Sequence, residues 1–109
     1  MFVEQTQQKE CQLDVEHMSS VLWILADSYC RKILETIKEK PMSCVEISIE
    51  TKIPISTVYR RMQELQDQKL VHTSGSITED GKKYFLYKSR VQAIHATFDG
   101  KLELKVTRK

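Results

Sequence analysis

Glycines and cysteines number three each in this chain of 109 residues, and long apolar runs are missing; each of these features argues against a class of protein. The three glycines all stand at positions typical of turns, which leaves none for a phosphate-binding loop. The three cysteines, Cys11, Cys30 and Cys44, are odd in number and widely spaced, which favours a reducing compartment over a disulfide framework. The longest apolar run, Val21 to Ala26, is far shorter than the roughly 20 residues that span a membrane.

Motifs of catalysis and metal binding are also missing. The sequence has neither a Gly-x-Ser-x-Gly elbow nor a His-Glu-x-x-His pair, and His17, His72 and His95 are too dispersed for a tetrahedral metal site. Polar residues follow Met1-Phe2-Val3 at once, so no signal peptide is predicted. We therefore expect a cytoplasmic protein that is not an enzyme and that holds no metal or cofactor.

Charge is unevenly distributed along the chain, although the net charge is only +2. Residues 1–53 hold 6 Lys/Arg and 9 Asp/Glu, and residues 54–109 hold 11 and 6, so the halves carry −3 and +5. The basic half favours a polyanionic partner such as DNA.

A short helix is predicted at about 44–51. The hydroxyl of Ser43 can cap its first turn, and Glu46 can bond back to the Ser43 amide, as in a capping box. Val45 and Ile49 are expected to face inward, with Ile47 as a third candidate. Pro54 ends this helix, since proline has no N–H and disfavours helical backbone before it.

A second helix, at about 55–68, has one apolar and one polar face. At about 100° per residue, Val58, Met62 and Leu65 share the buried side. The opposite side carries residue types that read base edges or contact phosphate; it comprises Ser56, Tyr59, Arg60, Gln63 and Asp67. An ordinary solvated face is the alternative interpretation of the same pattern.

A basic hairpin follows. Strand-like runs at about 70–76 and 82–88 flank Glu79-Asp80-Gly81, and Asp-Gly favours a hairpin turn. Lys82 and Lys83 then stand at the tip, where they can contact the phosphate backbone. Taken alone, these lysines could equally protect a strand edge. Two helices around a tight break and then a hairpin predict a helix-turn-helix with a β-wing.

Several of these segments resemble ArsR-type (ArsR/MarR-like) winged helix-turn-helix transcriptional regulators, in the small prokaryotic and particularly archaeal style. The run LADSYCRKIL at 25–34 is similar to the family's LADPTRRRIL, and ISTVYRRM at 55–62 is similar to QSTVSRHL. Leu70-Val71 resembles the entry to the wing, with Lys69 replacing the usual glycine. The resemblance covers roughly residues 20–88 and implies DNA binding. Metal-sensing relatives carry Cys-x-Cys where this chain has Ser43 and Val45, so the resemblance does not extend to a thiolate site.

The two ends of the chain lie outside this core pattern. Residues 1–13 are Gln-rich and unpatterned, so a flexible arm is expected, followed by helices at about 15–26 and 28–39, capped by Asp14 and Asp27. Strands at about 91–98 and 101–107 flank an Asp99-Gly100 turn. A two-residue turn would place Ala93, His95 and Thr97 on the face of Leu102, Leu104 and Val106. This hairpin is expected to pack on the N-terminal helix, and both to contribute to a homodimer.

The combined prediction is one α+β domain over residues 14–109, a winged helix-turn-helix that binds double-stranded DNA sequence-specifically as a homodimer. Two alternatives are a weakly specific, chromatin-like DNA-coating protein and a winged-helix module that docks on proteins. The predicted dimer surface is formed by Val15, Met18, Leu22 and Trp23. The predicted DNA contacts are Ser56, Thr57, Tyr59, Arg60, Arg61, Gln63, Lys82 and Lys83. Operator, effector and direction of regulation stay open.

Overall fold

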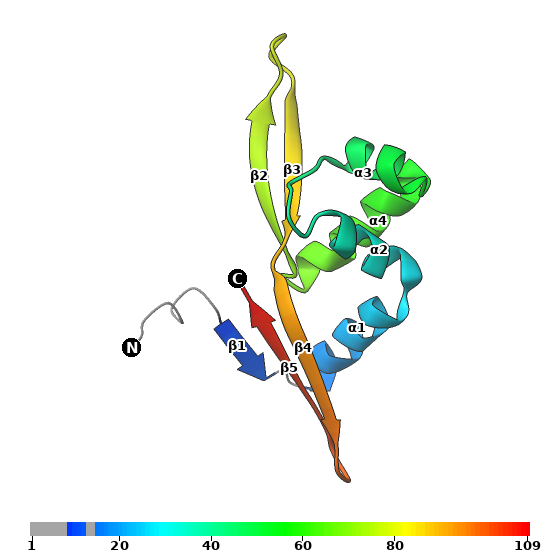
Figure 1. Ribbon diagram of the computed structural model, residues 1–109, viewed down its shortest axis with the longest axis vertical. Coiled ribbons are helices and arrows are strands. Elements are labelled where there is room, and N and C mark those ends of the chain that lie inside the picture. Colours follow the sequence, from blue (N-terminus) through cyan, green and yellow to red (C-terminus); the bar gives the residue numbers. More distant parts are fainter. Residues whose placement is uncertain (1–8, 13–14) are drawn as a thin grey trace.

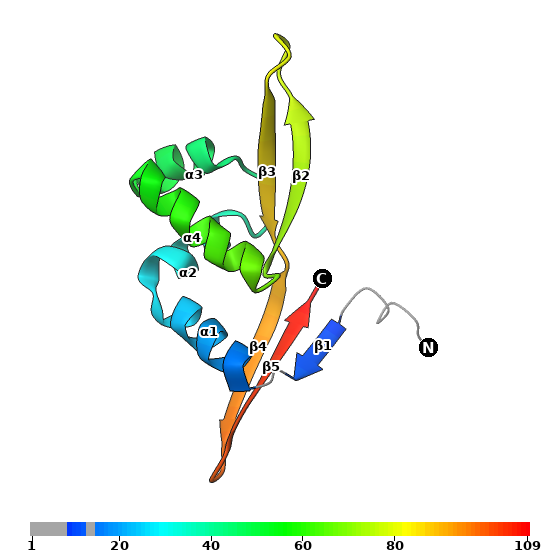
Figure 2. The same cartoon turned by 180° about the vertical axis from the view of Figure 1, so that it is seen from behind.

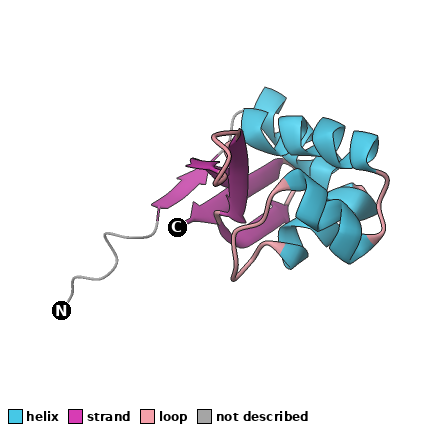
Figure 3. Ribbon diagram, turned by 90° about the horizontal axis from the view of Figure 1, so that it is seen from above, coloured by secondary structure: helices cyan, strands magenta, loops and turns pink. Residues whose placement is uncertain are grey.

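Four helices and five strands make up the part of the chain that the computed structural model describes, residues 9–12 and 15–109. The helices gather on one side of the strands (Figure 3). The helices are α1 (Val15–Ala26), α2 (Ser28–Thr36), α3 (Cys44–Thr51) and α4 (Ile55–Asp67). The strands are β1 (Lys9–Gln12), β2 (Val71–Ile77), β3 (Lys83–Ser89), β4 (Val91–Phe98) and β5 (Leu102–Arg108).

The strands form two sheets that extend toward opposite ends of the molecule (Figures 1 and 2). One is the β2–β3 hairpin, which projects past α3, and the other has the order β1-β5-β4 and runs alongside α1. The molecule is elongated, with extents of 54 × 37 × 20 Å. The expected α+β winged helix-turn-helix architecture is confirmed.

A single apolar core joins the helices to the second sheet. The predicted stripe of α4, Val58, Met62 and Leu65, is fully buried there, as are Leu104 and Val106 from β5. Burying apolar surface of this kind contributes roughly 25 cal/mol per Å². Helix α1 supplies Met18, Val21 and Ile24 to the same cluster, so the C-terminal hairpin and the N-terminal helix share one core.

Helix α2 ends at Thr36, three residues before its predicted end. The amide of Ile37 still bonds to the Ile33 carbonyl at 3.1 Å, but the Ile37 carbonyl accepts a 3.0 Å hydrogen bond from the Ser89 amide of β3. A long-range backbone partner therefore replaces the next helical turn. Its predicted N-cap is confirmed, because the Asp27 carboxylate accepts from the Cys30 amide at 2.9 Å.

The predicted inward face of α3 is wrong for Val45 and Ile49 and is confirmed for Ile47. Val45 and Ile49 are 53% and 73% exposed, whereas Cys44 and Ile47 are buried. Residues 44 and 47 lie three apart on one side of the helix, and 45 and 49 lie four apart on the other, so only one pair can face the core. The capping box at the start of α3 is confirmed by two hydrogen bonds between Ser43 and Glu46, 2.9 and 3.1 Å long.

The predicted register of the C-terminal hairpin is also wrong, by one residue. Phe98 pairs with Leu102, so the loop has three residues, and Gly100 in it takes a φ of +74°. A slip of one residue transfers every side chain to the other face of the strand. Leu102, Leu104 and Val106 therefore face the same side as Phe98, Ala96 and Ile94 instead of Thr97, His95 and Ala93.

The expected flexible arm at residues 1–13 includes a strand. Residues 9–12 form β1, which pairs antiparallel with β5 from Lys9↔Arg108 to Gln12↔Lys105. Residues 1–8 and 13–14, including the predicted cap Asp14, lie outside the described residues. β5 is thus the central strand of its sheet, and its Leu104 and Val106 are completely buried in the core.

Candidate nucleic-acid interface

The turn between α3 and α4 is tight and internally bonded. Lys52 takes the left-handed conformation (φ 64°) and donates its amide to the Ser48 carbonyl at 2.8 Å. The Ser48 hydroxyl then donates to the Ile53 carbonyl at 2.6 Å, and Ile53 is buried. Pro54 is the N-cap of α4, a position that needs no amide donor. These bonds fix the angle at which α4 leaves α3.

The polar face of α4 points to solvent, as the sequence predicts. Ser56, Tyr59, Arg60 and Gln63 are all exposed, and Thr57 is half-buried. Gln63 donates to the Asp67 carboxylate at 3.1 Å, one turn along the helix. Within the described part of the chain, Arg60 makes no ion pair, so its guanidinium is available to a ligand.

Arg61 does not share this face. Its guanidinium lies 3.0 Å from the Asp27 carboxylate and 3.5 Å from that of Glu64, and it stands over the Trp23 ring, 5.2 Å from the centroid. Because consecutive helical residues are about 100° apart, Arg60 and Arg61 cannot both face outward in the same direction. The prediction of Arg61 as a DNA contact is replaced by a structural role, in which Arg61 ties α4 to α1 and α2.

The Asp27 carboxylate is therefore shared between a helix cap and an ion pair. Burial by itself would raise its pKa, but the hydrogen bonds with Cys30 and the charge of Arg61 outweigh that effect and lower the pKa below 3.8. The carboxylate is ionised near neutral pH, and it holds the start of α2 against α4. Sequence reasoning found the cap but missed the ion pair, which spans 34 residues of chain.

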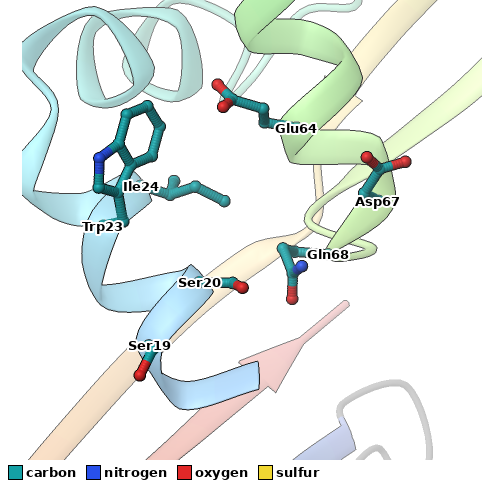
Figure 4. A pocket seen from close by; sticks show the side chains of 7 residues that line it. All are labelled: Ser19, Ser20, Trp23, Ile24, Glu64, Asp67 and Gln68. Atoms are coloured by element: carbon teal, nitrogen blue, oxygen red, sulfur yellow. The ribbon is translucent and has the colours of Figure 1, made fainter. Parts of the chain in front are cut away.

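A hollow of about 430 Å³ lies between α1 and α4 (Figure 4). It is lined by Ser19, Ser20, Trp23, Ile24, Glu64, Asp67 and Gln68. The carboxylates of Glu64 and Asp67 lie at its α4 edge, and Asp67 also closes the C-terminal end of the polar face that carries Arg60 and Gln63. A polyanion is therefore favoured at the N-terminal part of this face, around Arg60, rather than at its acidic C-terminal end.

The wing is a regular hairpin with a bonded tip. Its register runs from Val71↔Ser89 to Ile77↔Lys83. At the tip, the Lys82 amide donates to the Thr78 hydroxyl at 3.0 Å, that hydroxyl bonds to Asp80, and Gly81 takes a φ of +87°. Lys82 and Lys83 are exposed. The wing is also joined to the segment before α3, since Met42 and Tyr87 exchange two backbone hydrogen bonds of 2.8 and 3.0 Å.

The two cysteines whose side chains are described are core residues. Burial raises the pKa of Cys30 to about 12 and that of Cys44 to about 11, so both are neutral thiols at pH 7. Ser43 and Val45, the two positions compared above with a Cys-x-Cys pair, are a helix cap and an exposed apolar residue. Among the residues that the structure describes, no three His, Cys, Asp or Glu side chains gather in a way that could hold a metal ion.

Helix, turn, polar helix and basic hairpin, in this order and on one core, define a winged helix-turn-helix fold. Comparison with known proteins agrees: residues 25–74 match a family model described as a helix-turn-helix domain. The crystal structure of NolR from Sinorhizobium fredii is similar, with a TM-score of 0.55 and 19% sequence identity over 68% of this chain and 69% of that one. No curated protein matches.

In the described part of the chain, none of the helices has the length and apolar character needed to cross a bilayer.

Proposed function

We propose that this protein is a transcriptional regulator that binds double-stranded DNA sequence-specifically, as a homodimer. The observation that carries the proposal is the exposed polar face of α4 together with an exposed lysine pair on the wing, of which Lys83 borders the same hollow as Tyr59. Arg60 and Gln63 are suited to base edges in the major groove, where arginine reads guanine and glutamine reads adenine. Ser56, Thr57 and Tyr59, in the first turns of α4, are suited to phosphate or base contacts.

The homodimer is proposed because one recognition helix reads only a few base pairs. Two-fold pairing doubles the site and sets the half-sites about 34–36 Å apart. Of the predicted dimer surface, Met18 is 8% exposed and belongs to the core of the chain itself, which removes it from the surface. Leu22 is half-buried and Trp23 is 48% exposed, so Trp23 is the strongest remaining candidate for a contact across the dimer interface. The side chain of Val15 lies outside the described residues.

Selection of bound fragments from random duplexes, followed by a salt titration, tests the proposal. A specific regulator should prefer its selected site over unrelated duplexes by at least ~10³ at physiological salt. Equal, salt-sensitive affinity for every duplex would instead indicate a DNA-coating protein. No binding to any nucleic acid would favour a protein-docking module and would overturn the proposal.

Arg60→Ala tests the recognition helix directly. If Arg60 makes a bidentate contact with guanine, its loss should cost about 1–3 kcal/mol on the selected site and should relax the preference at that base pair. Arg90→Ala is the matched control, because Arg90 precedes β4 and its side chain donates to the Lys109 carbonyl at 3.3 Å. An equal loss of affinity on all sequences would make Arg60 a phosphate contact instead.

A further inference from the structure

Exposed aromatic and aliphatic side chains gather between the recognition helix and the wing. Tyr59 on α4 is 55% exposed and Phe85 on β3 is 54% exposed, and Tyr84 and Val45 are also exposed. Exposed apolar residues scattered singly are ordinary, but a contiguous group marks a binding surface. Here the group borders one hollow, so its members share a location as well as a chemistry.

This hollow has a volume of about 360 Å³, within the range of roughly 300–1,000 Å³ typical of small-ligand sites. It is lined by Ser43, Cys44, Val45, Tyr59, Thr78, Lys83, Tyr84, Phe85 and Tyr87. Its lining residues come from the start of α3, from α4 and from β3, which are elements that lie near one another in Figure 1. The buried Cys44 and half-buried Tyr87 form its inner part, and the exposed rings of Tyr59 and Phe85 form its rim.

The pairing of the wing explains why the Phe85 ring is uncovered. Lys83, Phe85 and Tyr87 alternate along β3 and share one face. The residue opposite Phe85 on β2 is Gly75, which has no side chain, and a Cβ placed there would meet no atom within 4 Å. The ring therefore has no cross-strand neighbour of its own, and its face is open to a ligand.

A cationic group accompanies the rings. Lys83 is exposed and lines the hollow, Lys82 precedes it at the wing tip, and Arg60 follows Tyr59 on the exposed side of α4. Burial, together with Cys44 and Tyr59, raises the pKa of Tyr87 above 10, so its hydroxyl stays protonated and can donate a hydrogen bond. Aromatic faces, a hydrogen-bond donor and nearby lysines form the combination that binds single-stranded nucleic acid.

An intact duplex cannot use these rings well. Its bases are stacked on one another, and it presents phosphates and groove edges, whereas an unpaired base presents a π-face. We propose that the hollow between Tyr59 and Phe85 receives an unstacked nucleobase of DNA, with Lys83 close to the adjoining phosphate. Resting on the proposed DNA interface, this inference adds a preference for duplexes that are locally melted.

Fluorescence anisotropy with three labelled DNAs tests the inference: a duplex, the same duplex with a short central bubble, and the single strand. Stacking of one base contributes about 1–3 kcal/mol, so the bubble should bind about 5- to 150-fold more tightly than the duplex. In Phe85→Ser, the affinity for the bubble should fall to that for the duplex. Phe98→Ser is the matched control, because Phe98 is 77% exposed at the distal end of β4, and it should leave the ratio unchanged. A 2-aminopurine in the bubble should be quenched by the unmutated protein and not by Phe85→Ser.

The outcomes separate this inference from the proposed function. Duplex binding with no preference for the bubble would overturn the inference alone, and absence of all DNA binding would overturn both. An equal loss of duplex and bubble affinity in Phe85→Ser, with unchanged circular dichroism, would make Phe85 a duplex contact and overturn the base site. A fourth labelled probe is an RNA strand of the same sequence as the DNA single strand; if it bound more than about tenfold better than the DNA strand, DNA would be overturned as the ligand.

Discussion

Adjacent arginines on one helix have different environments. Arg60 faces solvent, whereas the side chain of Arg61 is only 18% exposed and contacts Asp27, Glu64 and Trp23. Arg61→Ala should therefore lower the free energy of unfolding by about 1–3 kcal/mol, because it removes charge-assisted hydrogen bonding and a cation–π contact. Thermal or urea unfolding measures this loss.

The matched comparison is Arg60→Ala, which should leave stability within about 0.5 kcal/mol of the unmutated protein, as for most surface substitutions. Base preference at the selected site should change in Arg60→Ala and persist in Arg61→Ala, once the latter is measured below its melting temperature. The opposite result, with normal stability and lost base preference in Arg61→Ala, would restore Arg61 as a DNA contact.

The same ion pair predicts an acid-sensitive step in stability. The folded-state pKa of Asp27 lies below its ordinary value of 3.8, so its contribution is fully present above about pH 4 and is lost as pH falls through the lowered pKa. Asp27→Asn keeps a capping side chain but removes the charge. The melting temperatures of the unmutated protein and of Asp27→Asn should differ near pH 6 and should converge on acidification. A difference in melting temperature that does not depend on pH would show that the helix cap alone, and not the charge of Asp27, causes the loss of stability.

Among the elements, the wing is the one whose role depends most directly on charge. Lys82 and Lys83 stand at its tip without a salt bridge to any described residue. Replacing either by alanine should weaken binding to every duplex alike and should lower the slope of log affinity against log salt by about 1. Lys88→Ala is the control, because Lys88 is nearer the base of β3 and its side chain is on the face opposite Lys83. An unchanged slope in the double alanine variant would show that the wing is directed away from DNA.

At the scale of the whole molecule, the number of chains that assemble on DNA determines how long a DNA site can be read. We expect a homodimer by sedimentation at tens of micromolar, and Trp23→Asp should dissociate it, because a charge in place of an exposed indole disfavours a desolvated contact. Ile49→Asp, on the exposed side of α3, is the control and should leave the dimer intact. A monomer that binds one copy per DNA site would contradict the dimer and favour a monomeric architectural binder.

Local signals in the sequence determined most of the elements. The helix over 15–26, the capping box at Ser43, the break before Pro54 and the buried stripe of α4 depend on neighbours within a few residues, so periodicity and capping chemistry suffice to predict them. The exposed face of α4 follows from that stripe, which is why Arg60 and Gln63 could be predicted to point outward.

Tertiary structure alone decided the remainder, because the partners lie far apart in the chain. Arg61 is placed by Asp27, 34 residues away, and α2 is stopped by the Ser89 amide on β3. The register of β4 on β5 depends on a three-residue loop, and an Asp-Gly pair does not specify the length of that loop. Strand β1 forms by pairing with the edge of β5 that β4 leaves free, near the other end of the sequence. Helical spacing left two choices for the buried face of α3, and packing against the rest of the core selected Cys44 and Ile47.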